Sequence, residues 1–133
     1  MDRRTKDLLL ILARDLAANL STPTYLVDDA GTLVYFNEAA EALLGQTFQS
    51  TGELSAEAMI KLWRPTDRDG NPLPAEQIPI VAAVRERRPR QGLLGFTGSD
   101  GARRVIHASA VPLLATPERL SGAIAFFWEE PAE

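Results

Sequence analysis

Residues 24–45, TYLVDDAGTLVYFNEAAEALLG, constrain the fold of this chain more than any other stretch. TYLVD and LVYF are short runs rich in β-forming residues, and Asp29, Ala30 and Gly31 between them supply the chemistry of a tight turn, so the sequence predicts a β-hairpin. Asn37 then precedes a helical pattern that closes at Gly45. Asn37 has two interpretations, a helix N-cap and a polar group facing a pocket, and its amide can serve in both.

The remainder of the chain alternates helical and strand patterns in a fixed order. SAEAMIKLW predicts a helix capped at Ser55, residues 64–79 are rich in turn residues, and PIVAAVRERR predicts a second helix beginning at Pro79. Three strand-length runs follow, within residues 90–99, 103–113 and 119–130, with a turn at Ser99-Asp100-Gly101 and a break at Pro112 and the ATPE stretch. This order predicts an α+β fold with one five-stranded antiparallel sheet.

Residues 4–20 predict an amphipathic helix with an unusually wide apolar stripe. Leu9, Leu12, Leu16 and Leu20 form one line, with Leu8 and Ile11 beside it. A single helix cannot bury this face by itself, so we expect it to lie on the sheet of its own domain, on a second copy, or on both. We assign residues 1–20 to this helix, residues 21–130 to one domain, and residues 131–133 to a tail.

Composition excludes several classes of function. The 133 residues contain no cysteine, which excludes disulfides, thiolate nucleophiles and cysteinyl adducts, and agrees with a reducing, cytoplasmic location. The net charge of −4 does not favour nucleic acid or an anionic membrane as a partner. No run of residues has the length and hydrophobicity of a membrane span, and Arg14 and Asp15 interrupt the apolar run that a signal peptide would need.

Four pieces of the sequence, in order and at the right spacing, resemble the PAS sensor domain. They are LVDDAGTLVYFNEAAEALLG, DRDGNPLPAEQIPIVAAVRER, SDGARRVIHASAVPL and SGAIAFFWEE. The resemblance covers residues 20–130 and implies a five-stranded antiparallel sheet with helices on one face, here preceded by the amphipathic helix. One departure is the end, FFWEEPAE, which lacks the Asp-Ile-Thr-like signature that joins many PAS domains to an effector. A complete chain of this kind would signal through a separate protein.

The resemblance implies a ligand pocket between the helices and the inner face of the sheet. Period-two alternation divides the last two strands into two sets. The first is Ile106, Ala108 and Ala110 with Ala123, Ala125 and Phe127, and the second is Val105, His107, Ser109 and Val111 with Ile124, Phe126 and Trp128. By resemblance the first set faces the pocket, and its alanines leave volume that either a ligand or Phe48, Met59 or Trp63 must fill. The predicted ligand-binding residues are Tyr25, Val27, Tyr35, Asn37, Ile80, Val84, Phe96, Ile106, Ala108, Ala110, Ala123, Ala125 and Phe127.

Cofactor and catalytic chemistry find little support in the residues. His107 is the only histidine, and alternation puts it on the outer face; the helix at residues 79–88, where relatives carry a haem ligand, has none, so we expect no haem and no metal. A cysteinyl-flavin adduct is excluded, whereas non-covalent flavin stays open without a motif for it. We find no nucleophile–base pair, acid pair or metal cluster and expect no enzyme.

The sequence is compatible with two functions. The first is a bacterial-type signal sensor that binds a small apolar ligand and passes the signal through homodimer or partner contacts. The second is a ligand-free module for protein–protein interaction, with its pocket packed shut. For both we predict a homodimer, because the helical stripe and the outer-face row of the last strand are together too apolar to remain in water. The predicted interface residues are Leu8, Leu9, Leu12, Leu16, Ile124, Phe126 and Trp128.

Overall fold

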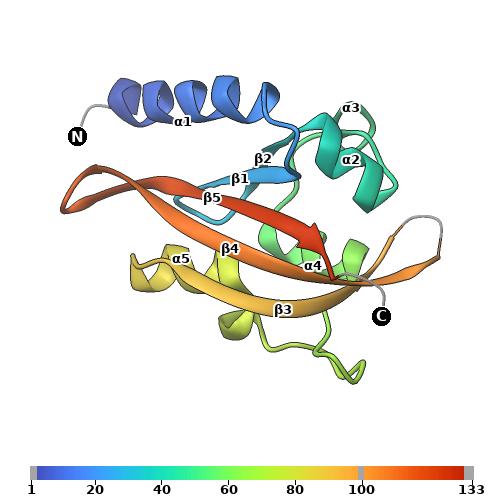
Figure 1. Cartoon of the computed structure of the whole chain (residues 1–133). Coiled ribbons are helices and arrows are strands. Elements are labelled where there is room, and N and C mark those ends of the chain that lie inside the picture. The colour runs from blue at the N-terminus through green and yellow to red at the C-terminus, as the bar shows by residue number, and fades with distance from the viewer. Residues whose placement is uncertain (1–2, 99–100, 131–133) are drawn as a thin grey trace.

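The computed structural model describes residues 3–98 and 101–130, with side chains described from Leu8 onward. The predicted turn at Ser99-Asp100 and the tail at 131–133 lie outside the described residues. The chain runs through helices and strands in the predicted order (Figure 1). These elements are α1 (Arg3–Ala18), β1 (Thr24–Asp28), β2 (Leu33–Phe36), α2 (Glu38–Leu44), α3 (Phe48–Thr51), α4 (Ala56–Trp63), the 3₁₀ helix η1 (Ala75–Gln77), α5 (Pro79–Glu86), β3 (Arg90–Thr97), β4 (Arg103–Thr116) and β5 (Arg119–Glu129).

The strands form one antiparallel sheet in the order β2-β1-β5-β4-β3, which confirms the predicted fold class. The last strand lies at the centre of the sheet, where it joins the N-terminal hairpin to the C-terminal strands. Ala108 lies opposite Phe127 and Ala110 opposite Ala125, while His107 lies opposite Trp128. The two sets predicted from alternation therefore occupy opposite faces of the sheet.

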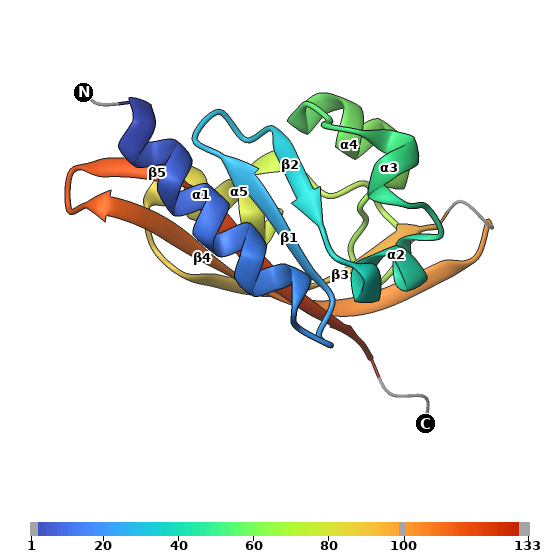
Figure 2. The ribbon, with the colours of Figure 1, turned by 90° about the horizontal axis from the view of Figure 1, so that it is seen from above.

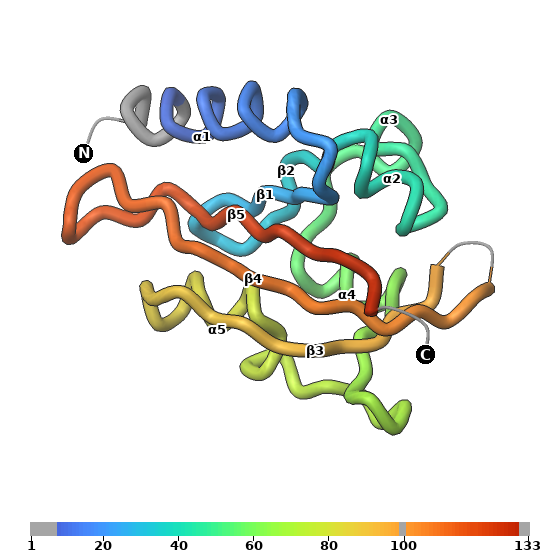
Figure 3. Tube along the Cα trace, viewed as in Figure 1, coloured from blue at the N-terminus to red at the C-terminus, as the bar shows by residue number. Residues whose placement is uncertain are grey.

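Helices cover both faces of this sheet. α1 lies across the outer face, against β5, β1, β4 and β2 (Figures 1 and 2). α5 packs on the inner face against β3, β4 and β5, and the Cα trace shows α4 on the same side (Figure 3). Within the described part of the chain no helix has the length and hydrophobicity that a bilayer span requires.

Local capping explains where the short helices begin. Asn37, Thr47 and Ser55 each accept a first-turn backbone N–H through the side chain, and α2 ends at Gly45 in the left-handed conformation, with φ of 76°. Sequence analysis did not predict α3, because a helix of four residues has no periodicity. Its one signal was the cap at Thr47.

Pro112 does not end the second C-terminal strand, and this prediction was wrong. β4 continues through Pro112, which pairs with Ala123, as far as Thr116. The neighbouring strand β3 pairs with β4 only between Arg90–Ala110 and Thr97–Arg103. Beyond Ala110 one side of β4 is therefore an edge, where a residue without a backbone N–H is tolerated.

α1 contacts the sheet through its small residues. Ala13 and Ala17 are buried, and Ala13 packs in one cluster with Leu26 and Ile124 of the outer face. Leu12 and Leu16, predicted as interface residues, are each 57% exposed. Small helix residues meet bulky sheet residues here, so the helix can lie close to the strands only with its leucines turned away.

Candidate functional site

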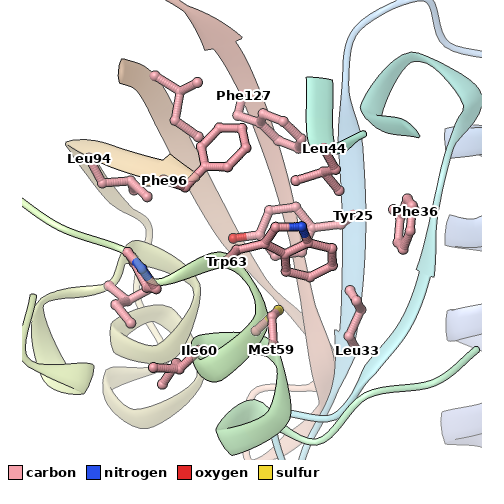
Figure 4. Close-up of a pocket in the computed structure, with 13 residues that line it drawn as sticks. Tyr25, Leu33, Phe36, Leu44, Met59, Ile60, Trp63, Leu94, Phe96 and Phe127 are labelled. Carbon is pink, nitrogen blue, oxygen red and sulfur yellow. The ribbon is translucent and has the colours of Figure 1, made fainter. Parts of the chain in front are cut away.

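An apolar cavity of about 70 Å³ lies between the inner face of the sheet and α4 (Figure 4). It is built from β1, β2, β3, β4 and β5 on one side and from α2, α4 and the segment before α5 on the other. Its lining residues are Tyr25, Leu33, Phe36, Leu44, Met59, Ile60, Trp63, Pro65, Ile78, Leu94, Phe96, Ile106 and Phe127.

Aromatic rings in edge-to-face contact make the wall of the cavity rigid. The ring centroids of Phe36 and Trp63 are 6.0 Å apart, and those of Tyr25 and Phe127 are 5.6 Å apart. Phe48 packs behind Phe36 at 5.4 Å. Such pairs contribute about 0.5–1.5 kcal/mol beyond the burial of their surface. These contacts fix the rings against one another along the border of the cavity.

The size of the cavity limits what it can hold. Pockets for drug-sized ligands or cofactors measure roughly 300–1,000 Å³. An engineered apolar cavity of about 150 Å³ holds benzene. By the same proportion a cavity of 70 Å³ accommodates about three or four non-hydrogen atoms, too few for flavin or haem unless α4 moves away from the sheet.

Two polar groups belong to the cavity wall. Trp63 is 6% exposed, and its indole N–H has no hydrogen-bond partner in the described part of the chain. Tyr25 contributes its phenol, and burial raises the pKa of this hydroxyl well above its usual range, so it stays protonated at neutral pH. Tyr25 is the one titratable side chain among the lining residues of the described cavity.

Four of the predicted ligand-binding residues line the cavity: Tyr25, Phe96, Ile106 and Phe127. The nine other lining residues were not predicted as ligand-binding. Met59 and Trp63 were considered only as side chains that would fill the pocket, and they form part of its wall instead. The available signal was the apolar row of the helix at residues 56–63, whose distance from the sheet the sequence does not give.

The alanines on the inner face do not line the cavity, because α5 covers that part of the sheet. Pro79, at the start of α5, lies 3.3 Å from where a Cβ on Gly92 would stand, and Gly92 pairs with Ala108. At the other end, Arg87 donates a hydrogen bond of 2.9 Å to the carbonyl of Glu118. The predicted residues Val27, Ile80, Ala108, Ala110, Ala123 and Ala125 are buried in the same core as the cavity wall, with Val84 packed against it.

Asn37 is a structural residue whose polar atoms are all in use, so its predicted place in a ligand pocket was wrong. It is 1% exposed, and its Oδ1 accepts the backbone N–H of Ala40 at 3.0 Å and of Thr24 at 3.1 Å. Its Nδ2 donates to the carbonyls of Ala17, Thr22 and Leu20 at 2.9, 3.0 and 3.3 Å. One side chain thereby joins the end of α1, the start of β1 and the first turn of α2.

Tyr35 lies on the outer face, because it pairs with Leu26 across the hairpin, and its prediction as a pocket residue was also wrong. The Arg14 guanidinium stands 4.5 Å from the centre of the Tyr35 ring. Both border a second hollow of about 540 Å³ between α1 and the hairpin. Its wall mixes apolar and charged groups: Leu10, Ile11, Arg14, Leu26, Asp28, Asp29, Val34, Tyr35, Glu53 and Ser121.

The predicted interface residues separate into exposed and covered groups. Leu8, Leu12 and Leu16 are more than half exposed, and Trp128 is 48% exposed. Leu9 and Phe126 are half-buried and Ile124 is buried, so α1 of the same chain already covers much of the outer-face row of β5. Ile124 is therefore not available to a second copy.

His107 lies on the outer face, as predicted, in a small cluster at the end of β5. Its ring stacks on Trp128, with centroids 5.8 Å apart, and its Nε2 is 3.9 Å from the Glu130 carboxylate. Arg68 makes two hydrogen bonds of 3.0 and 2.7 Å to Glu130 and lowers the pKa of that carboxyl. Among the described residues, no three His, Cys, Asp or Glu side chains gather where they could hold a metal ion.

Comparison with known proteins agrees with this architecture. The sequence model of the PAS fold matches residues 13–128. None of the curated proteins matches the sequence significantly. The PAS domain of a protein from Colwellia psychrerythraea is similar, with a TM-score of 0.64 and 16% identity over 92% of this chain and 97% of that one. The PAS domain of BvgS from Bordetella pertussis gives 0.61 and 18%, over 92% and 86%, and the RsLOV d2 variant gives 0.71 and 17%, over 97% and 68%.

Proposed function

Because this chain belongs to the PAS family of signal-sensing domains, we propose that it senses a small apolar ligand in the cavity beneath α4 and passes the signal on through α1. The observation that carries the proposal is the cavity itself, bordered by packed aromatic rings and lined almost entirely by apolar side chains. An apolar cavity of this kind does not hold water well and gains free energy from an apolar occupant.

A short physical connection joins the cavity to α1. Phe36 lines the cavity, and the next residue, Asn37, holds the carbonyl of Ala17 at the end of α1. Along β1, Tyr25 faces the cavity, whereas the adjacent Leu26 packs in the cluster that holds Ala13 of α1. A ligand that shifts β1 or β2 would therefore change how α1 packs on the outer face.

We propose a second copy of this chain as the partner of α1. Leu8, Ile11, Leu12 and Leu16 are 55–57% exposed and form a continuous row on the helix, at the spacing that a partner helix would cover. We call these four residues the α1 row. A two-fold axis beside it would place each α1 row against its counterpart, which is the commonest arrangement in oligomers.

The expected dimer is weak. A fully buried leucine contributes about 1.5–3 kcal/mol, so each half-exposed member of the α1 row adds about 1 kcal/mol when covered. Eight such residues in a dimer supply roughly 8 kcal/mol, which is of the same size as the association cost of about 4–15 kcal/mol. Trp128 and Val111, also exposed on the outer face, would have to contribute for tight association.

Ligand binding is tested by native mass spectrometry and an absorption spectrum of freshly purified protein. We expect a co-purifying small molecule in the wild type. Leu94→Phe, which adds volume from the cavity wall, should lose it and keep the thermal unfolding temperature within a few degrees. A wild-type protein of clean apo mass that also fails to take up xenon under pressure would contradict the proposal.

Dimerisation is tested by sedimentation equilibrium of the intact chain at tens of micromolar. We expect Leu12→Asp with Leu16→Asp to give monomer, and Leu12→Met with Leu16→Met to keep the dimer. Ala18→Asp adds one negative charge to the same helix outside the α1 row and is the control for the single variant Leu12→Asp. A monomeric wild type with a stable fold would show that the α1 row is an exposed face without a homotypic role.

The second candidate is a ligand-free interaction module that acts on a separate signalling protein. The small cavity volume favours it, because 70 Å³ lies below the range of most ligand pockets. Under this alternative the Leu94→Phe variant would retain every partner contact of the wild type. We assign no catalytic step in either case, since Tyr25 is the one titratable group that lines the described cavity.

A further inference from the structure

The two polar groups in the cavity wall specify more about the occupant than its size does. An indole N–H can donate a hydrogen bond and cannot accept one. The N–H of Trp63 has no acceptor in the described part of the chain, although the residue is 6% exposed. A buried donor without an acceptor is unfavourable, so an occupant that supplies one is favoured over an occupant that does not.

Tyr25 presents a second donor to the same space. Its ring is fixed edge-on against Phe127, and the described residues provide no hydrogen bond to its hydroxyl. Figure 4 shows the Tyr25 oxygen on the side of the cavity away from β1, and the indole nitrogen of Trp63 on the ring edge turned towards Leu44 and Phe127. Both groups belong to the lining of one cavity.

The lining carries no side chain that is charged at neutral pH. The remaining lining residues are aliphatic, aromatic, Met59 or Pro65. An anion enclosed here would lose its hydration without gaining a cationic partner, which is strongly unfavourable. A neutral acceptor such as a carbonyl oxygen has two lone pairs and can accept from two donors at once.

We propose that the cavity binds a small neutral carbonyl compound, whose oxygen accepts hydrogen bonds from the Trp63 indole and the Tyr25 hydroxyl and whose apolar body contacts the aromatic wall. This inference rests on the proposed function, since it names the chemical class of the ligand for that site. A ketone, aldehyde, ester or amide of about three or four non-hydrogen atoms matches both the donors and the volume.

The test compares two probes of the same shape. Acetone and isobutene differ only in the replacement of the carbonyl oxygen by a CH₂ group. Binding is followed in the intact chain by the indole ¹H–¹⁵N signals, of which there are two, from Trp63 and Trp128. Trp128→Phe assigns them, and Trp128, on the outer face, is the internal control.

We expect acetone to move the Trp63 indole proton downfield and to bind about threefold to thirtyfold more tightly than isobutene, the effect of one or two net hydrogen bonds. Tyr25→Phe removes one donor with almost no change of shape and should reduce this preference to the contribution of Trp63 alone. Trp63→Phe should abolish the indole signal and most of the preference. Should that variant fail to fold, the wild-type shift and Tyr25→Phe still decide the question.

The outcomes separate this inference from the proposed function. If both probes bind equally and the Trp63 signal does not shift with the ketone, the carbonyl assignment is overturned while ligand binding stands. Tighter binding of acetate, which has the size of acetone and carries an acceptor together with a negative charge, also overturns it. If neither probe binds at millimolar concentration and the Trp63 proton shows contact only to water, both the carbonyl assignment and the proposed ligand binding fail.

Discussion

The two faces of the sheet solve the same packing problem in opposite ways. On the inner face the small residues belong to the sheet, and α5 approaches over Gly92 and the alanines of β4 and β5. On the outer face the small residues belong to the helix, and α1 approaches through Ala13 and Ala17 over bulky strand residues. Close approach is achieved on both faces.

As a result, the apolar side chains that these helix–sheet contacts do not cover lie in different places on the two faces. On the inner face the aromatic rings outside the footprint of α5 meet α4 and enclose a cavity. On the outer face the leucines of α1 turn to solvent as the α1 row. The difference teaches that one domain can keep an apolar cavity and an exposed apolar row apart, with only the thickness of the sheet between them.

Asn37→Ala should have the largest effect on how α1 is held against the outer face, because this side chain joins α1 to the rest of the domain. We expect a loss of about 2–4 kcal/mol in the free energy of unfolding, from a lost N-cap and unpaired buried groups. Urea unfolding measures it. Asn37→Ser keeps a capping oxygen for α2 but cannot reach the α1 carbonyls, so it should recover part of the stability while α1 still exchanges its amide hydrogens faster. Equal stability of the Ala and Ser variants would contradict this division of roles.

Ala110→Leu tests whether the alanines serve close packing. Ala110 is fully buried and does not line the cavity, so the added side chain has no free volume to enter. We expect destabilisation by about 1–3 kcal/mol, measured by chemical unfolding. Leu94→Phe, at the cavity wall, is the matched enlargement and should cost clearly less. The reverse order would mean that free volume lies beneath α5 and not beneath α4.

A smaller effect distinguishes the environments of the two tyrosines at alkaline pH. Because burial raises the pKa of Tyr25 in the folded chain, the folded state holds its proton above about pH 10 while the unfolded chain releases it. The contribution of Tyr25 to the free energy of unfolding is thus complete below about pH 10. It is lost as the pH rises, by about 1.4 kcal/mol per pH unit. We expect stability to fall less steeply with pH in Tyr25→Phe than in Tyr35→Phe. Urea unfolding from about pH 9 to about pH 11 measures both slopes. Identical slopes would show that Tyr25 is hydrated in the folded state.

The sequence by itself determined the local structure and the fold class. Turn residues at Asp29 and Gly31, caps at Asn37 and Ser55, and alternation along β4 and β5 depend on near neighbours, so they could be read without knowing the tertiary arrangement. The order of these elements predicted the five-stranded antiparallel sheet, and the PAS resemblance predicted its family. The prediction failed locally where a distant strand decides the outcome, as at Pro112, whose tolerance depends on where β3 begins.

The tertiary structure alone decided where the cavity lies and which face of α1 is covered. Alternation correctly separated the two faces of β4 and β5 but could not tell that α5 would fill the space over the alanines. Alternation also could not show that the polar atoms of Asn37 would all be hydrogen-bonded to three segments. Nor could it show that Trp63 would be buried with an N–H that has no partner among the described residues. Periodicity names the apolar residues of an element, whereas the distance and rotation between packed elements depend on the side chains of both partners, which lie far apart in the sequence.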